Sequence, residues 1–405
     1  MSAILEELKS PAVAESQPGR RRKIRFCRNE WSGAFGDIGT DLPLLAGMIL
    51  ATGVNPANVF ILFGMMQIFS ALVYRIPMPA QPLKLVAVIV IAQQTPPELI
   101  WGAGLVVGVG MLLLTVTGLL DLIARVVPKP VVRGIQLGLG LNLAYVALAS
   151  YLPAEGVPGY FLAAGGIILV LVLLGNRRWP ASLAVLGLGF VYAFIFKHDM
   201  IFANGGATWS LPVPSLPPWA AIAQGAVLLA LPQIPLSIGN SVLATRQIAR
   251  DHFPEAGVTI RKIGVSYSIM NFVSAPLGGV PVCHGSGGMA GHYAFGGRTG
   301  GSVIIYGVFM ACLGLAFGSG FDGIIELFPL PVLGVILGVE AIALMRLLRD
   351  QAFAVHALGI ALLVGAVAFA LPHGFLIGIV GGTVLYWLMT RWQRSAARGG
   401  HTGTD

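Results

Sequence analysis

The chain contains one membrane-associated pattern twice, and this repetition limits the possible fold more than any other feature. In the first half a proline-rich segment, residues 77–84 (PMPAQPLK), precedes an apolar run. In the second half the corresponding segment is 281–288 (PVCHGSGG), which precedes a run of small residues. A Pro-x-Pro-Val motif follows in each half, at 128–131 and 329–332, so these two copies lie 201 residues apart. Interrupted hydrophobic segments at matching positions of two halves are typical of the binding site of a secondary transporter.

The amino-acid composition places most of the chain in a membrane. Hydrophobic residues make up 56% of the sequence and charged residues only 10%, whereas soluble domains have roughly 25% charged residues. The net charge is +8, but the basic residues are scattered in short segments between apolar spans, which is the pattern of topology signals. We therefore expect membrane lipids around the protein and no nucleic-acid partner.

The apolar runs predict an all-α polytopic membrane protein with fourteen segments. A helix needs about 20 apolar residues to cross a bilayer and fewer to reach its middle. The predicted segments are 31–53, 56–74, 82–94, 99–124, 130–151, 158–175, 180–197, 219–245, 259–276, 284–296, 301–319, 329–348, 352–371 and 374–392. The third and the tenth are too short to cross alone. We predict that these two are half-helices, each preceded by a short extended segment.

The arginine and lysine residues indicate the orientation of the segments. With a cytoplasmic amino terminus, nearly all of these residues lie on the inner side, and the predicted external loops contain Lys197 alone. This asymmetry predicts cytoplasmic termini, and we expect the cell inner membrane as the location. Seven segments per half is an odd number, so we expect two inverted repeats, 31–199 and 216–392. A basic tail, 1–30, and a second tail, 393–405, would lie in the cytoplasm.

The starts of the two predicted half-helices form a candidate anion site. The first turn of a helix leaves N–H groups unpaired and carries about half a positive charge, so two such ends attract an anion. Pro82 is expected in the first turn of the first half-helix, where an N–H group is not needed. Gly285, Gly287 and Gly288 would let a ligand approach the backbone of the second. The alternative is that these glycines only allow tight helix packing.

Lys84 is predicted one turn into the first half-helix, far from either membrane face. A lysine inside the bilayer is costly and is a functional candidate for that reason. We interpret it as a cation that lines the anion site; the alternative is a lysine that snorkels or pairs with a carboxylate. Gln81 and Ser286, beside the two helix starts, are further candidates for substrate binding.

Uncharged polar residues are also expected near the centre of the protein. Asn240 and Ser241 lie in the eighth segment, and Ser241 corresponds to Thr40 of the first segment by the same offset of 201 residues. Such side chains either bind the oxygens of an oxyanion or hydrogen-bond to a neighbouring helix.

Three titratable residues are candidates for proton coupling, and two of them, Asp37 and His284, are also candidates for substrate contact. Asp37 lies early in the first segment and is a candidate for both roles. Glu340 lies about nine residues into the twelfth segment, where burial favours a neutral carboxyl group. His284 begins the tenth segment, and histidine titrates in the physiological range. For each of them a purely structural role remains the alternative.

No motif of an enzyme or of a metal site is found in the sequence. It has no GxxxxGK[ST], HExxH or GxSxG motif, so we expect neither an enzyme nor a nucleotide-driven pump, and no cofactor. The three cysteines, Cys27, Cys283 and Cys312, are scattered and lack metal-ligand spacing.

Together these motifs resemble the molybdate transporter family, a branch related to the SulP sulfate-transporter superfamily. The matching text is GAFGDIGTDLP at 33–43, PAQPLK at 79–84, CHGSGGMAGHY at 283–293, FGGRTG at 295–300 and PLPVLG at 329–334. The resemblance implies a seven-plus-seven inverted repeat, with a core domain that holds both half-helices and a gate domain. It also implies a tetrahedral oxyanion, molybdate or sulfate, between the third and tenth helices. Unlike SulP proteins, the chain is expected to lack a STAS domain, which leaves a homodimer open.

Three other functions fit the pattern in part. A nucleobase–proton symporter of the same fold would have carboxylates in the eighth and tenth segments, whereas this chain has Asn240 and Ser241 in the eighth and no acid in the tenth. An anion channel would need a continuous polar pathway, which the sequence leaves open. A membrane scaffold or sensor would tolerate the loss of Lys84. We therefore expect a secondary active transporter for molybdate, with sulfate as the alternative, that works by alternating access with protons as the candidate coupling ion.

Overall fold

Helices make up nearly all of the computed structural model, which describes residues 23–173, 181–196, 212, 214–317, 329–351, 355–371 and 373–399. Each of the fourteen predicted segments contains helix. Within the described residues, six helical runs are long and apolar enough to cross a bilayer, or seven if one bent pair is counted as a span. Large apolar side chains such as Phe161 and Val172 are more than 70% exposed, as expected of a surface in contact with lipid. The prediction of a helical multi-pass membrane protein is confirmed.

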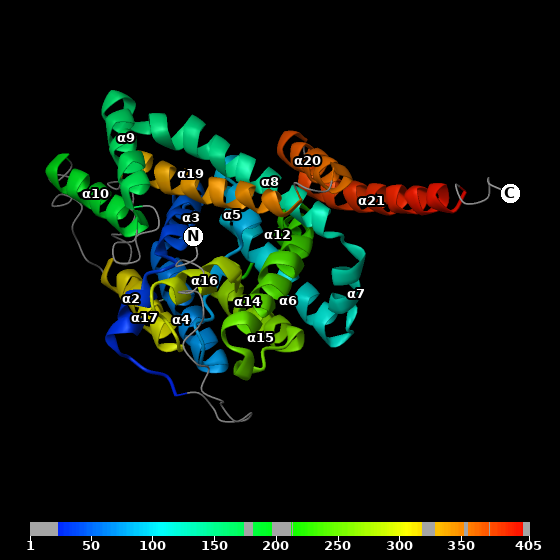
Figure 1. The fold of residues 1–405 in the computed structure, drawn as a ribbon. Coiled ribbons are helices and arrows are strands. Elements are labelled where there is room, and N and C mark those ends of the chain that lie inside the picture. Colours follow the sequence, from blue (N-terminus) through cyan, green and yellow to red (C-terminus); the bar gives the residue numbers. More distant parts are fainter. Residues whose placement is uncertain are drawn as a thin grey trace, which may run out of the picture.

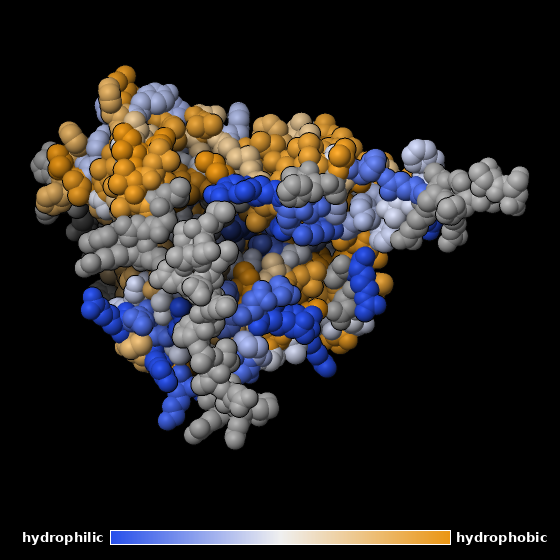
Figure 2. Space-filling view, viewed as in Figure 1, coloured by the Kyte–Doolittle hydropathy of each residue, from blue (hydrophilic) through white to orange (hydrophobic). Residues whose placement is uncertain are grey.

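The helices form two groups that lie one above the other in Figure 1. The lower group and the central helices are α2 (Arg28–Ala34), α3 (Ile38–Thr52), α4 (Pro56–Tyr74), α5 (Lys84–Gln93), α6 (Pro97–Val116), α7 (Leu119–Val126), the run from α12 (Trp219–Gly225) through α13 (Leu231–Leu236) to α14 (Thr245–His252), α15 (Ile260–Ser274), α16 (Ser286–Ala294) and α17 (Gly301–Phe317). The upper group is α8 (Lys129–Val146), α9 (Gly156–Leu173), α10 (Ala181–Phe196), α19 (Leu330–Arg346), α20 (Val355–Ala370) and α21 (Gly374–Gly399). In Figure 2 hydrophobic residues cover much of the upper helices, and hydrophilic residues run across the middle of the visible face.

Glycines allow the helices of each group to approach closely. In the lower group α4 packs on α17, and a Cβ atom at Gly307 would lie 2.7 Å from the carbonyl oxygen of Gly64. In the upper group α8 packs on α20, and a Cβ atom at Gly138 would lie 2.5 Å from that of Ala368. Contacts this short leave no room for a side chain, so van der Waals packing of small residues holds these helix pairs together, as is usual in membranes.

Two segments that the sequence predicts as single helices are broken. The first, 31–53, is divided between α2 and α3, which meet at a bend of 40°. At the break, a Cβ atom on Gly36 would lie 2.5 Å from the carbonyl carbon of Gly291, so the chain bends where it contacts α16. The fourth, 99–124, is divided between α6 and α7 by Gly118, whose φ of +74° is left-handed and favours glycine.

Two short strands pair with each other inside the lower group, where they contact α3, α4 and α15. Strand β1 (Ala80–Pro82) pairs with β2 (Val282–His284) in antiparallel register, with Gln81 opposite Cys283. Each strand leads directly into a short helix, α5 or α16. Pro82 ends a strand, so its predicted place in the first turn of a helix is wrong. Lys84 is the first residue of α5, so its predicted place one turn into the helix is also wrong. The physical reason is that proline restricts the residue before it to extended backbone, which suits the end of a short strand.

Amide side chains from neighbouring helices satisfy the outer edges of both strands. Gln67 of α4 donates to the carbonyl oxygen of Ala80 at 2.7 Å and accepts from its N–H at 2.8 Å. Asn271 of α15 donates to the carbonyl oxygen of Val282 at 2.7 Å and accepts from its N–H at 3.0 Å. A two-stranded sheet has two unpaired edges, and a buried edge without partners is costly. We call Gln67 and Asn271 the amide clamps.

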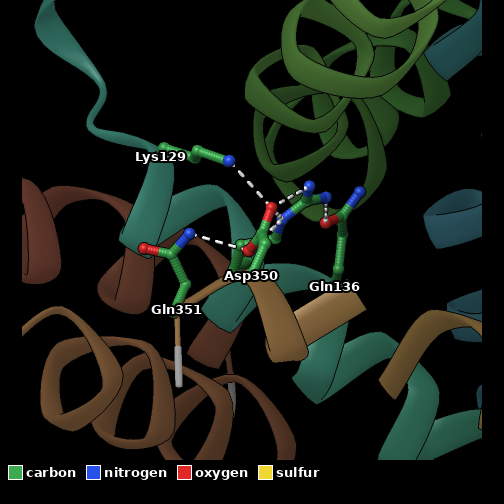
Figure 3. Close-up of polar contacts among 5 residues, drawn as sticks. Lys129, Gln136, Asp350 and Gln351 are labelled. Atoms are coloured by element: carbon green, nitrogen blue, oxygen red, sulfur yellow. Dashed lines mark hydrogen bonds and ion pairs between the residues drawn. The ribbon is translucent and has the colours of Figure 1, made fainter. Parts of the chain in front are cut away.

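A cluster of polar side chains joins two helices of the upper group (Figure 3). Asp350, just after α19, lies 2.8 Å from Lys129 Nζ and 2.6 Å from Arg133 Nη2 of α8. Gln351 donates to Asp350 at 2.7 Å, and Gln136 accepts from Arg133 at 2.8 Å. Because Lys129 is 63% exposed, its ion pair contributes little to stability; the cluster orders the end of α19 beside the start of α8.

Candidate functional site

The strand pair brings the starts of α5 and α16 together beside the start of α3. The Leu83 N–H, at the N-cap of α5, donates to the carbonyl oxygen of Pro281 at 3.0 Å. Gly285 is the N-cap of α16, and Asp37 is the N-cap of α3. Three helices therefore begin near one point, and the N-terminal ends of helices favour negative charge.

Asp37 and Gln81 form the buried hydrogen-bonded pair of this site. Gln81 Nε2 lies 2.7 Å from both carboxylate oxygens of Asp37, and the two residues are only 3% and 1% exposed. Gln81 Oε1 has no hydrogen-bond partner among the described residues. The pair packs on the first turn of α16, because Cβ atoms at Gly285 and Gly288 would overlap Gln81 and Asp37 respectively.

A second set of polar side chains comes from the π-helical stretch Ser237–Ala244 between α13 and α14. Such stretches are frequent at functional sites, and Pro235 just before this one cannot donate a helical hydrogen bond. Asn240 accepts from the Ser286 hydroxyl at 3.2 Å. Ser241 lies beside the Cys283 thiol. Both contacts link this stretch to the second strand and its helix.

Lys84 and Thr40 are half-buried, as is Asn240. Lys84 is the first residue of α5. Thr40 lies in the first turn of α3, where its N–H donates to the carbonyl oxygen of Asp37 at 3.0 Å. Gly287 in the first turn of α16 is exposed, and a Cβ atom there would meet nothing within 4 Å. Of the three glycines of the 285–288 segment, Gly287 is the one that faces open space.

His284 points away from these residues. Successive side chains of a strand lie on opposite faces, so the Cys283 side chain shares the face of Gln81 and the His284 ring takes the other. The ring is fully buried, with Nε2 2.7 Å from Ser266 Oγ and Nδ1 3.5 Å from Ser70 Oγ. The structure therefore brings His284 together with α4 and α15 and not with Asp37.

Glu340 belongs to α19 in the upper group. Its side chain lies outside the part of the chain that the structure describes, so its role stays a prediction.

The sequence interpretation missed several residues that build the site. Gln233 of α13 accepts from the Val86 N–H of α5 at 3.4 Å and donates to Ser237 at 2.9 Å. Cys283 faces Gln81, and the amide clamps hold the two strands. The signal that was available is the presence of polar amides inside apolar spans, which is costly without a function.

Replacing Gly288 with alanine is expected to disrupt the Asp37–Gln81 pair and to abolish the anion transport that the sequence predicts. The added methyl group would overlap the carboxylate of Asp37 and come within 2.7 Å of Pro79 Cγ, so the Asp37–Gln81 pair must separate or α16 must shift. Uptake of radioactive anion into proteoliposomes measures the effect. Gly338→Ala is the control, because a Cβ atom there meets nothing within 4 Å; equal uptake by the two variants would contradict the expectation.

Comparison with known proteins places the chain in a family. The family profile described as "Molybdate transporter of MFS superfamily" matches residues 29–143 and 225–344, more than half of the chain. Molybdate transporter 1 of Arabidopsis thaliana is 31% identical, over 91% of this chain and 89% of its own. Molybdate transporter 2 of the same plant is 32% identical over 82% of each chain, and Molybdate transporter 1 of Chlamydomonas reinhardtii is 27% identical over 92% and 95%.

Solved structures of two anion transporters share the fold. The transmembrane domain of the cyanobacterial bicarbonate transporter BicA is 17% identical with a TM-score of 0.63, over 90% of this chain and all of that one. Murine Slc26a9, an anion transporter in the inward-facing state, is 14% identical with a TM-score of 0.67, over 96% of this chain and 75% of that one. At these identities the likeness shows the fold alone. The sequence relatives show more: this chain belongs to the molybdate transporter family, a family of membrane transporters and not of enzymes.

Proposed function

We propose that this chain takes up a tetrahedral oxyanion, molybdate first, across the cell inner membrane. The observation that carries the proposal is the β1–β2 pair, which sets the starts of α5 and α16 side by side. The relatives described as molybdate transporters support the choice of anion. The arginine and lysine asymmetry supports cytoplasmic termini.

The charges near the site suit a dianion. Each of the three helix starts contributes about half a positive charge, and Lys84 contributes one more, so the sum is about +2.5, enough to balance the two negative charges of molybdate. Asp37 reduces this sum when it is ionised. A proton on Asp37 would restore it, which is the physical reason to propose that a proton accompanies the anion. Ser286 and Asn240 supply neutral hydrogen-bonding groups beside the helix starts.

We further propose that the chain is a seven-plus-seven inverted repeat and that the lower and upper helix groups act as core and gate in alternating access. The matching roles of the two amide clamps, which lie 204 residues apart, support the repeat. So do the hydroxyls of Ser70 and Ser274, which donate to the carbonyl oxygens of Met78 and Val280 at 2.6 and 2.7 Å. In each half, one amide and one serine side chain therefore hydrogen-bond to the strand and to the backbone just before it.

The membrane potential makes uptake of a dianion alone unfavourable. Moving one charge across 100 mV corresponds to about 2.3 kcal/mol, so a dianion entering a negative interior costs about 4.6 kcal/mol. Two protons would make the cycle electrically neutral, and a third would let the potential drive uptake. Of the three coupling candidates, Asp37 is the one whose described side chain lies in the site.

Proton coupling predicts that molybdate uptake rises as the external pH falls at a clamped membrane potential. Proteoliposomes with a fixed internal pH provide the measurement. Asp37→Asn keeps the size of the side chain and removes its titration, so we expect this variant to lose most of the pH dependence. Wild-type uptake that does not change with external pH would exclude coupling and leave the anion site itself untouched.

Calorimetry of the purified protein with molybdate, sulfate and a nucleobase tests the proposed substrate. We expect molybdate to bind most tightly and sulfate more weakly, because the sequence relatives are described as molybdate transporters. Tighter binding of sulfate would reassign the substrate within the same oxyanion class. Binding of the nucleobase alone would reject the oxyanion proposal in favour of a symporter of the same fold.

A further inference from the structure

A groove lies on the surface of the lower helix group, on the side of the strand pair toward which the His284 ring points rather than on the side of Asp37. It runs between the second half of α4 and the first half of α15 and has a volume of about 430 Å³. Its walls are mainly apolar, and one of its two ends is basic. Its lining includes Phe69, Val73, Arg261, Lys262, Val265 and Ile269. The described lining contains no carboxylate. The groove is therefore amphipathic, with a cationic end and a hydrophobic length.

The basic end of the groove is ordered by the start of α15. Thr259 caps this helix, and its hydroxyl oxygen accepts from the Lys262 N–H at 3.1 Å. Lys262 Nζ donates to the carbonyl oxygen of Val73 at 3.0 Å and lies 4.6 Å from the centre of the Tyr74 ring. Arg261 is exposed beside it. Two cations at the amino-terminal end of a 15-residue helix attract an anion there.

The apolar length of the groove continues into a hydrophobic surface. Met65 and Leu72 of α4 are 46% and 54% exposed, and Ile269 of α15 is 41% exposed. A free phosphate ion would gain nothing from these walls. An extended peptide would need partners for its backbone groups, whereas an acyl chain needs only apolar contact. Basic side chains at the end of a membrane helix commonly reach toward lipid headgroups.

We propose that this groove binds one anionic phospholipid of the surrounding bilayer. The headgroup phosphate lies at Arg261 and Lys262, and one acyl chain lies along Val73, Val265 and Ile269. The cationic end complements the charge of the headgroup, and the apolar walls complement the chain. A zwitterionic lipid of the same chain length fills the walls but lacks the net charge that Arg261 and Lys262 attract.

Native mass spectrometry of the intact protein, released from nanodiscs of equal phosphatidylglycerol and phosphatidylcholine, tests the proposal. We expect one retained phosphatidylglycerol per chain in preference to phosphatidylcholine. Arg261→Gln should lower that retention about fivefold, the effect of one basic residue near a lipid surface. Arg250→Gln is the matched control, because Arg250 is equally an exposed arginine at a helix end but does not line the groove.

The apolar walls need a separate test, since charge alone also attracts soluble anions. Ile269→Trp should fill the groove and lower retention, while Val273→Trp, one turn further along α15 and outside the lining, should not. Equal retention of the two lipids, or equal losses in Arg261→Gln and Arg250→Gln, would overturn the proposal. Displacement of the lipid by millimolar glycerol 3-phosphate would also overturn it, because the site would then be one for soluble phosphate.

Discussion

Lys84→Gln is expected to weaken molybdate binding by about ten- to hundredfold. A hydrogen bond from a charged donor contributes about 1.5–3 kcal/mol, and the half-buried position of Lys84 at the start of α5 limits screening by water. Glutamine keeps a hydrogen-bond donor, one bond closer to the backbone, but removes the positive charge. Calorimetric titration with molybdate measures the change, and uptake into proteoliposomes should fall with it.

Lys129→Gln is the matched control for this prediction. Lys129 is also the first residue of a helix, α8, but it is 63% exposed and pairs with Asp350 far from the strand pair. We expect the Lys129→Gln variant to bind molybdate with the affinity of the wild type. We expect Lys84→Arg to keep most of the molybdate affinity. If Lys84→Gln binds molybdate as tightly as the wild type, the cation does not act on the anion, and the helix starts must hold it without Lys84.

The sequence predicts the helices well because burial in lipid imposes long apolar runs. Each of the fourteen predicted segments contains helix. The errors lie where the backbone changes direction, at 35–37 and at Gly118. The break at Gly118 rests on its left-handed φ of +74°, whereas a contact with a distant residue decides the break at 35–37. Gly36 bends where it meets Gly291, a residue 255 positions away, and no local pattern reports such a contact.

The site was predicted in part, since the sequence identifies polar residues near the helix starts but not the directions of their side chains. Asp37 and Gln81 were both candidates, and their hydrogen bond spans 44 residues. His284 and Cys283 show the difficulty most clearly. A strand alternates its side chains, so one residue of register decides which of the two faces the site. A strand of three residues has no periodicity from which to read that register.

Asn271→Leu is expected to destabilise the protein by about 2–6 kcal/mol, and Gln67→Leu by a similar amount. Each substitution removes both partners of a buried strand residue, Val282 or Ala80. A buried backbone group left without a partner costs about 1–3 kcal/mol, and each variant leaves two such groups. Denaturant unfolding of the purified protein in detergent gives the free energy, with Gln247→Leu alongside as the control.

Gln247 separates the loss of a clamp from the loss of any amide side chain. It is exposed, and its side chain makes a hydrogen bond of 2.8 Å to Asp251 on the same helix, so its replacement should change the free energy of unfolding by less than about 0.5 kcal/mol. If both clamp variants lose stability and Gln247→Leu does not, the two halves of the chain support their strands in the same way. If only one clamp variant has a lower free energy of unfolding, the two clamps do not have the same role, and the proposal of an inverted repeat loses its main structural support. The strands position α5 and α16, so we also expect molybdate affinity to fall in whichever clamp variant is destabilised.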